Sequence, residues 1–312
     1  MTWKQATGWT GRNDGPGPEH ARWHNTIQAW TDGAEPGAVL LGFASDEGVR
    51  RNKGRVGARD GAQALRAALS SIALHEPIRL YDAGDIEVDG EDLEAGQDAF
   101  ADVLAQLLRE GHFTVGLGGG HEITFASYAG LARALGDDSS WSLGILNIDA
   151  HFDLREAPLP SSGTGFAQIA KAQAAAGRPF RYAAVGISEA ANTKVLFDRA
   201  EELGVAVLLD TECHLGNLPA VREFIANFAD SVDHLYLTID LDALPASVAP
   251  GVSAPAGFGV SLEVVREIVL AAARSGKLKH ADIAELNPLF DIDQRTARTG
   301  ARLLNDLILN RG

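Results

Sequence analysis

Eight short apolar runs recur along this chain, separated by longer segments in which apolar residues have helical spacing. Short buried runs that alternate with helices are typical of βαβ units, whose parallel strands are covered by helices on both faces. The sequence therefore predicts an α/β fold with a central parallel sheet. The runs are Ala38–Phe43, Ile78–Tyr81, Phe113–Leu117, Leu143–Asp149, Tyr182–Ile187, Val205–Leu209, Leu235–Asp240 and Ala281–Leu286, and helical segments include Leu93–Arg109, Ile123–Leu135, Phe166–Ala176 and Leu262–Arg274.

The length of the chain, 312 residues, exceeds that of a typical domain, although open α/β sheets often reach this size as one unit. No linker rich in Pro, Gly or Ser, no charge block and no internal repeat divides the sequence. We therefore expect a single domain over residues 1–312, with residues 1–35 as an N-terminal extension.

The balance of charges limits the class of partner. Lys and Arg number 27 against 42 Asp and Glu, which gives a formal net charge of −15. A chain of this charge repels phosphates, so we expect no nucleic acid as a partner.

The single cysteine and the absence of long apolar stretches bear on the compartment. Cys213 has no partner for an intrachain disulfide, so nothing ties the chain to an oxidising compartment. The first residues lack the apolar stretch of a signal peptide, and no run approaches the roughly 18 apolar residues of a membrane span. We expect a soluble, cytoplasmic protein that does not enter a membrane.

Acidic and imidazole side chains stand two residues apart at the ends of two apolar runs. Asp149, His151 and Asp153 lie at the end of the fourth run, and Asp240 and Asp242 lie at the end of the seventh. In an extended backbone, residues at i, i+2 and i+4 point to the same side, so each set should converge. Burying these groups together is costly unless they bind a cation. Capping of a turn would also explain the second, acidic pair taken alone.

A glycine-rich segment supplies a sixth candidate ligand. The third run leads into Gly118-Gly119-Gly120-His121-Glu122, which opens a helix. A dinucleotide loop of the form G-x-G-x-x-G fails here because His121 occupies the last glycine position, and a tight strand-to-helix turn also explains the glycines. Ligands in open parallel sheets bind beyond the carboxyl ends of the strands. Three strand ends thus offer six side chains to one crevice: His121, Asp149, His151, Asp153, Asp240 and Asp242.

The composition of this ligand set indicates which metal it binds. Four carboxylates and two imidazoles without a thiolate suit Mn²⁺ better than structural Zn²⁺, and the histidines argue against Ca²⁺ and Mg²⁺. Six ligands are too many for one catalytic ion that keeps an open position. We therefore expect two Mn²⁺ per subunit, about 3.5–4 Å apart, with a bridging hydroxide that serves as nucleophile.

Three motifs together resemble one enzyme family. Gly-Gly-Gly-His-Glu, Asp-Ala-His-Phe-Asp and Asp-Leu-Asp, followed by Pro250-Gly251-Val252-Ser253 and Pro255, are similar in order and spacing to the ureohydrolase superfamily of arginases, agmatinases and formimidoylglutamases. The similarity runs from about residue 38 to 308. It implies a three-layer α/β/α fold with a central, mostly parallel eight-stranded sheet and a binuclear manganese centre.

The resemblance also implies roles for the ligands. Asp149 and Asp240 would bridge the two ions, and Asp153 would orient the bridging hydroxide. One ion would be completed by His121 and Asp153, the other by His151 and Asp242.

Glu285 occupies the position of the family's glutamate that grips the amidine or guanidinium group. A carboxylate at a strand end can pair with two N–H donors of a planar cation and fix its carbon. Without the family resemblance, this residue would be an ordinary acidic residue at the end of a strand.

Two positions depart from arginases. Arginases carry Asn at the position of Arg155, which here is a fixed cation suited to a substrate that bears a carboxylate. The segment 161–166 resembles the corresponding arginase loop but lacks its histidine. Both departures argue against an arginase.

Two stretches resemble formimidoylglutamases in particular, namely 45–58 and 189–193. The first stretch is basic and rich in glycine, and for Arg50 and Arg51 a solvated surface is as good an explanation as a contact with substrate. Within the family, the chain therefore resembles formimidoylglutamases most.

We accordingly expect a hydrolase that cleaves N-formimidoyl-L-glutamate to L-glutamate and formamide, a step of histidine degradation. Glu285 would hold the amidine, and Asp153 would carry a proton toward the departing nitrogen. Arg155 and Asn192 would bind a glutamate carboxylate. By resemblance to the family, the protein would form a homo-oligomer.

Two other functions stay open. A ureohydrolase that acts on a guanidino compound (guanidinobutyrate, arginine or agmatine) would release urea instead. A metal-binding protein without catalysis, serving in regulation or assembly, would keep the ligands but turn over none of these compounds.

Overall fold

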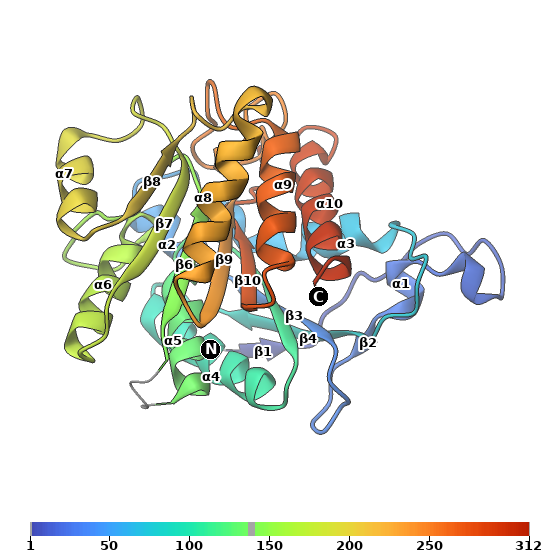
Figure 1. The fold of residues 1–312 in the computed structure, drawn as a ribbon. Helices are drawn as coiled ribbons and strands as arrows, with labels where there is room; N and C mark the ends of the chain where they lie inside the picture. Colours follow the sequence, from blue (N-terminus) through green and yellow to red (C-terminus); the bar gives the residue numbers. More distant parts are fainter. Residues whose placement is uncertain (1, 137–140, 312) are drawn as a thin grey trace.

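The computed structural model describes residues 2–136 and 141–311, and its centre is one continuous β-sheet (Figure 1). Within these residues the sheet has ten strands, ordered β1-β4-β3-β5-β10-β9-β6-β7-β8, with β2 pairing beside β4. The strands are β1 Thr2–Lys4, β2 Gln28–Ala29, β3 Ala38–Ala44, β4 Leu80–Glu87, β5 Phe113–Leu117, β6 Leu143–Ile148, β7 Arg181–Ile187, β8 Ala206–Leu209, β9 His234–Asp240 and β10 Leu278–Ala284.

The sheet is parallel except at one edge, where β1 pairs with β4 in the antiparallel sense. All eight apolar runs identified in the sequence form strands, β3 to β10. The expected count of eight strands is corrected to ten in the described residues, because the N-terminal extension contributes β1 and β2. These two strands are only three and two residues long, too short to produce a periodic pattern.

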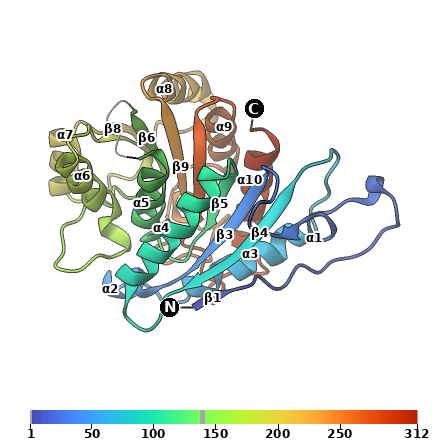
Figure 2. The ribbon, with the colours of Figure 1, turned by 90° about the horizontal axis from the view of Figure 1, so that it is seen from below.

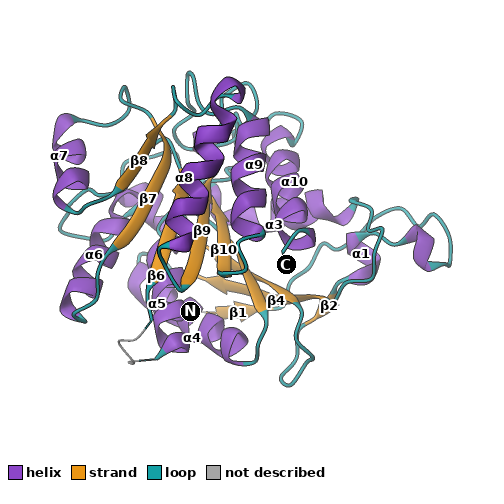
Figure 3. Cartoon of the chain, viewed as in Figure 1, coloured by secondary structure: helices purple, strands orange, loops and turns teal. Residues whose placement is uncertain are grey.

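Helices cover both faces of the sheet, which gives the expected three layers (Figures 2 and 3). On one face α3, α10, α9 and α8 pack side by side, and on the other α4, α5 and α6 do. The helices are α1 Trp23–Thr26, α2 Glu47–Arg51, α3 Gly61–Ser70, α4 Leu93–Arg109, α5 Ile123–Leu135, α6 Gly165–Ala175, α7 Lys194–Glu202, α8 Leu218–Asp230, α9 Leu262–Ala273 and α10 Arg295–Leu309.

The interior lies in separate apolar clusters on the two sides of the sheet. Every residue of β3, β5 and β6 is buried, because the layers of helices exclude water from both faces of these strands. A strand buried on both faces reads as a continuous apolar run rather than an alternating one, which is why the runs were visible in the sequence. No helix among the described residues is long and apolar enough to cross a membrane.

The strand order decides where functional side chains can meet. β5, β10, β9 and β6 are consecutive neighbours in the middle of the sheet, and all run in the same direction. Their carboxyl ends therefore form one edge, although they come from segments far apart in the sequence.

Candidate metal centre

The residues predicted to bind metal lie just beyond the carboxyl ends of three of these four strands. His121 follows β5, between that strand and α5, while Glu285 directly follows β10. The Asp149–Asp153 segment follows β6. Asp240 is the last residue of β9, and Asp242 lies in the short 3₁₀ turn after it, Leu241–Ala243.

The glycines before His121 allow close contact between backbones. The N–H of Gly119 donates to the carbonyl of Phe43 at 2.9 Å, and that of Gly120 donates to the carbonyl of Ser45 at 3.1 Å. A Cβ atom on Gly119 would lie 2.0 Å from the carbonyl oxygen of Ser45. The glycine run therefore serves the packing of strand ends, as the tight-turn explanation predicted.

The ligands form two groups, of which the first surrounds His121. Its Nδ1 atom lies 3.1 Å from Oδ2 of Asp149 and 2.9 Å from Oδ2 of Asp153. Oδ2 of Asp240 lies 3.3 Å from the same nitrogen. One ligand atom from each of these four residues lies within 4.8 Å of the other three, so a single cation could contact all of them.

The second group contains Asp149, His151 and Asp242. Nδ1 of His151 lies 3.4 Å from Oδ1 of Asp149 and 3.1 Å from Oδ2 of Asp242. Asp149 thus directs one oxygen to each group, which is the geometry of a carboxylate that bridges two ions. Oδ1 of Asp149 accepts the N–H of His151, and Oδ1 of Asp240 accepts the N–H of Asp242 in the same way, so bridging by either carboxylate stays a prediction.

The reason for this convergence differs from the one inferred from the sequence. Only Asp240 lies in a strand; the other four motif residues follow the strands, and Asp153 has a positive φ of 46°. The side chain of Asp149 accepts the backbone N–H of His151 at 2.7 Å, and Asp240 holds Asp242 in the same i, i+2 manner. Side-chain turns of this kind, rather than extended strands, therefore place the ligands together.

The carboxylates hold both imidazoles in their protonated form. The charge of Asp242 is the main influence that raises the pKa of His151 to about 12. Burial alone would lower the pKa of His121, but hydrogen bonds to Asp149 and Asp153 outweigh it and keep this pKa well above its usual value. Two protons thus partly balance a cluster of negative charges that a metal ion would otherwise balance.

The remaining charges show that the cluster fits cations. Burial, reinforced by the charges of Asp242 and Asp149, raises the pKa of Asp240 well above its usual value. Oδ1 of Asp242 is buried and has no hydrogen-bond partner among the described residues. A buried carboxylate oxygen without a partner costs free energy of folding unless it binds a cation. The donor set of carboxylates and imidazoles around a shared Asp149 therefore fits a pair of divalent ions.

Thr238, a residue of β9, contacts His121 of the first group on the side opposite the carboxylates. Its hydroxyl oxygen lies 3.0 Å from Nε2 of His121, the nitrogen that faces away from the carboxylates. Histidines that bind metals usually donate their second N–H to such a partner, which fixes the orientation of the ring. Sequence reasoning missed Thr238, although it stands two residues before Asp240 and the spacing argument would have placed it on the same side.

Glu285 lies in a strained position beside the first group. Its φ is 68°, and its backbone N–H donates to the carbonyl of Gly119 at 2.8 Å. One side-chain oxygen accepts the N–H of His121 at 2.8 Å, while the other is buried without a partner among the described residues. Burial and the nearby carboxyl of Glu122 raise the pKa of Glu285 to about 8. A carboxyl group in this state would gain a partner from a cationic ligand.

A cavity of about 300 Å³ opens over the two groups. Its walls include residues of both metal groups, Glu285 and Arg155, whose contact with substrate stays a prediction. The cavity therefore has buried acidic groups at one part and a cation at another, which suits a ligand that carries both signs of charge.

Asn192 does not line this cavity, in contrast to the predicted contact with substrate. Its Nδ2 donates to the carbonyls of Ala150 and Ser188, and its Oδ1 accepts the N–H of Phe152 at 3.1 Å. Both amide protons are used, so none is left for a carboxylate. The geometry gives Asn192 a different part: it holds the backbone of the loop that carries His151.

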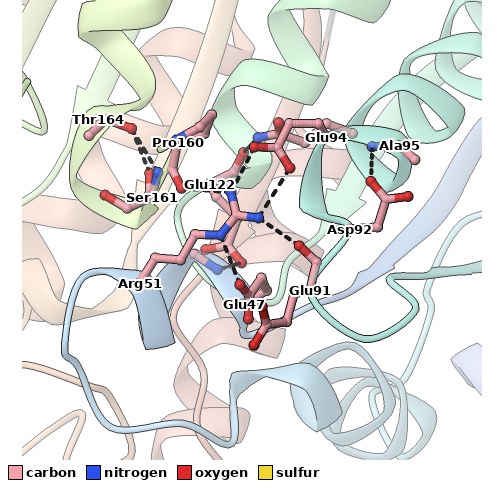
Figure 4. A network of polar contacts seen from close by, with 12 residues as sticks. Glu47, Arg51, Glu91, Asp92, Glu94, Ala95, Glu122, Pro160, Ser161 and Thr164 are labelled. Carbon is pink, nitrogen blue, oxygen red and sulfur yellow. Dashed lines mark hydrogen bonds and ion pairs between the residues drawn. The ribbon is translucent and has the colours of Figure 1, made fainter. Parts of the chain in front are cut away.

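Arg51 is neither a substrate ligand nor a solvated surface residue. All five of its N–H donors are used, on the side chains of Glu47 and Glu94 and on the carbonyls of Glu91 and Pro160 (Figure 4). Its side chain is only 10% exposed. It therefore ties α2 to the start of α4 and to the loop that follows Asp153. Neighbouring Arg50 is half exposed and pairs with the carboxylates of Glu47, which it shares with Arg51, and of Glu91.

Comparison with known proteins agrees with this arrangement. The sequence pattern of the arginase family matches residues 36–309. A formimidoylglutamase of Rhodococcus opacus strain B4 is 54% identical over 304 residues, which cover 97% of this chain and 95% of the relative.

Solved structures with the same fold include two formimidoylglutamases. The Trypanosoma cruzi enzyme, named formiminoglutamase and crystallised with Mn²⁺, superimposes with a TM-score of 0.77 at 25% identity, covering 88% of this chain and 93% of that chain. The Bacillus subtilis enzyme gives a TM-score of 0.82 at 22% identity, over 93% and 91% of the two chains, and supports the fold alone. Since the family pattern covers most of the chain and a relative is more than half identical over nearly all of it, the chain belongs to the arginase family.

Proposed function

We propose that this protein hydrolyses N-formimidoyl-L-glutamate to L-glutamate and formamide, with two Mn²⁺ per subunit. The observation that carries the proposal is the cavity itself, which combines the ligand groups, the unpartnered oxygen of Glu285 and the cation of Arg155. An amidine that also bears carboxylates is complementary to that combination. The high identity to a formimidoylglutamase supports the same substrate.

The metal ions would be held by the two groups that share Asp149. His121, Asp149, Asp153 and Asp240 form one group, and Asp149, His151 and Asp242 form the other. When bound, a manganese pair supplies a water-derived nucleophile at neutral pH and stabilises negative charge as it develops.

The residues of the chain position the substrate for this chemistry. Glu285 accepts the N–H groups of the amidine and so fixes its carbon at the metal groups. This alignment of the reacting atoms increases the rate of the reaction more than binding of the substrate alone would. Arg155 binds a carboxylate of the glutamate part.

Asp153 then transfers a proton from the water to the leaving nitrogen. Water adds its oxygen to the formimidoyl carbon, the bond from that carbon to the glutamate nitrogen breaks, and this nitrogen leaves with one added proton. Asp153 lies at the boundary of the first group and the cavity, where it can accept the proton of the water and pass it to the nitrogen.

The proposal extends to the molecule as a whole. Residues 1–312 act as one catalytic unit, and the extension 1–35 adds strands to the sheet of that unit. The protein works in the cytoplasm, as its single cysteine supports, and it forms a homo-oligomer. It does not bind nucleic acid, which its net charge of −15 supports.

The direct test is to supply manganese-loaded protein with four compounds and measure formamide and urea separately. We expect formamide from N-formimidoyl-L-glutamate and little urea from guanidinobutyrate, arginine or agmatine. Dominant release of urea would replace the proposal with a ureohydrolase. No turnover of any compound by protein that holds two ions would favour a non-catalytic metal-binding protein.

A variant separates the role of Glu285 from metal binding. Glu285→Gln keeps the shape of the side chain but cannot become the carboxylate that pairs with the cationic amidine. We expect kcat/KM for formimidoylglutamate to fall about 100-fold, with two manganese ions still bound per subunit by elemental analysis. An unchanged kcat/KM would exclude Glu285 from substrate binding.

A further inference from the structure

The cavity over the metal groups has cationic side chains that the ligand motifs do not explain. Besides Arg155 it is lined by Lys53 and Arg55, which follow α2. The metal groups are buried apart from the partly exposed His151, whereas Lys53 and Arg155 are exposed, so these cations lie where a ligand enters from solvent.

Arg55 is already committed to the protein. Its guanidinium donates to the carbonyls of Val252 and Ser253 and lies 4.3 Å from the centre of the Phe290 ring. In contrast, the side chains of Lys53 and Arg155 form no hydrogen bond or ion pair within residues 2–136 and 141–311. Two unpaired cations therefore face the cavity.

The backbone of Lys53 is unusual in a way that bears on why a lysine stands there. Its φ is 62°, in the left-handed region, directly after the end of α2. The chain reverses here, because the N–H of Lys53 donates to the carbonyl of Arg50 at 3.0 Å and the N–H of Gly54 donates to the carbonyl of Val49 at 2.8 Å. Helices usually place glycine at this point, since any Cβ atom strains the left-handed conformation. The fold alone would favour glycine, and the lysine side chain adds no hydrogen bond or ion pair within the described residues.

We propose that Lys53 binds one carboxylate of an acidic amidine substrate, while Arg155 binds another. This inference rests on the proposed function, because N-formimidoyl-L-glutamate carries two carboxylates besides its amidine. Glu285 accounts for the amidine, and the two unpaired cations account for one carboxylate each. Lys53 is thus a residue that determines specificity for a dicarboxylic substrate over an amine such as agmatine, which has no carboxylate.

The strained backbone makes a sharp test possible, since Lys53→Gly removes the cation and relieves the strain together. We expect KM for formimidoylglutamate to rise about tenfold with a much smaller change in kcat, because a hydrogen bond to a charged group is lost. The melting temperature should stay the same or rise. Lys53→Arg should restore most of the affinity, and Lys194→Met, on the surface of α7, should match the wild type.

A second measurement separates this inference from the proposed function. The affinity of the manganese-loaded protein for L-glutamate, measured by calorimetry, should fall in Lys53→Gly and recover in Lys53→Arg. If the wild type releases no formamide but binds L-glutamate through Lys53, the proposed function fails and the inference stands. Wild-type hydrolysis with an unchanged KM in Lys53→Gly would overturn the inference alone, as would a lower melting temperature without recovery by arginine. A wild type that neither hydrolyses the substrate nor binds L-glutamate would overturn both.

Discussion

The imidazole of His121 is held at both of its nitrogens. Nδ1 faces the carboxylates of the first ligand group, and Nε2 faces the hydroxyl of Thr238. Thr238 in turn interacts with the buried carboxylate of Asp282, which also accepts hydrogen bonds from Ser127 and Tyr236 at 2.6 Å. The hydroxyl can accept the N–H of His121 and donate to Asp282, so a chain of hydrogen bonds sets which nitrogen is free to bind metal.

Thr238→Val tests this chain, because valine keeps the shape of threonine but removes the hydroxyl. We expect manganese affinity to fall by about 10–100-fold, the usual effect of removing such a partner. The matched control is Thr238→Ser, which keeps the hydroxyl and should bind manganese like the wild type. Equilibrium dialysis gives both affinities. Equal weakening in the two variants would show that packing matters here and the hydrogen bond does not.

At the scale of elements, one arginine joins three segments near the cavity. The guanidinium of Arg51 connects α2, the start of α4 and the loop after Asp153. Loss of Arg51, whose side chain is 10% exposed, would remove all of these links together and leave acceptors on Glu47, Glu94 and the carbonyl of Pro160 without their donor. A buried charge that loses its partner is costly.

Arg51→Met should therefore lower the free energy of unfolding by roughly 3 kcal/mol, measured by urea denaturation. Its neighbour provides the control: Arg50→Met also takes a partner from Glu47, but Arg50 is half exposed and bonds to neither α4 nor the loop after Asp153, so this variant should cost only about 1 kcal/mol. Similar losses in the two variants would mean that Arg51 does not connect these elements.

The bounds of strands and helices could be predicted from the sequence more fully than the contacts between side chains. The strand β5 and the helices α4 and α5 have the bounds expected from apolar periodicity, because burial on a defined face leaves a regular pattern. The turns that bring Asp149 to His151 and Asp240 to Asp242 leave no such pattern, so an extended backbone was inferred instead.

The same limit applies to the cavity. Acidic and imidazole ligands are recognisable because their spacing is rare, and all six fall into the two groups. Lys53 was not singled out and Asn192 was assigned to a substrate carboxylate, because exposure and hydrogen-bond partners depend on loops from several elements. The first lines the cavity unpaired, and the second is used by its own loop.

For the whole molecule, metal binding and pH are linked through the ligand groups. His151 has a pKa of about 12 without metal, and that of His121 also lies well above its usual value, so both imidazoles carry protons at neutral pH. A cation can bind their nitrogens only after these protons leave. Manganese affinity should therefore rise with pH between about 6 and 8, by about tenfold per unit for each proton released.

Calorimetry in two buffers of different ionisation enthalpy counts these protons. We expect release of at least one proton per manganese-loaded subunit at pH 7. An affinity independent of pH, with no proton release, would show that the imidazoles are neutral before the metal binds.

The whole interpretation depends on two cations sharing Asp149 at the edge formed by β5, β9 and β6. Anomalous diffraction at the manganese edge, from crystals grown with Mn²⁺, tests this most directly. We predict two peaks about 3.5–4 Å apart, one beside His121 and Asp153 and the other beside His151 and Asp242, with Asp149 between them. A single peak, or peaks away from these side chains, would contradict the account.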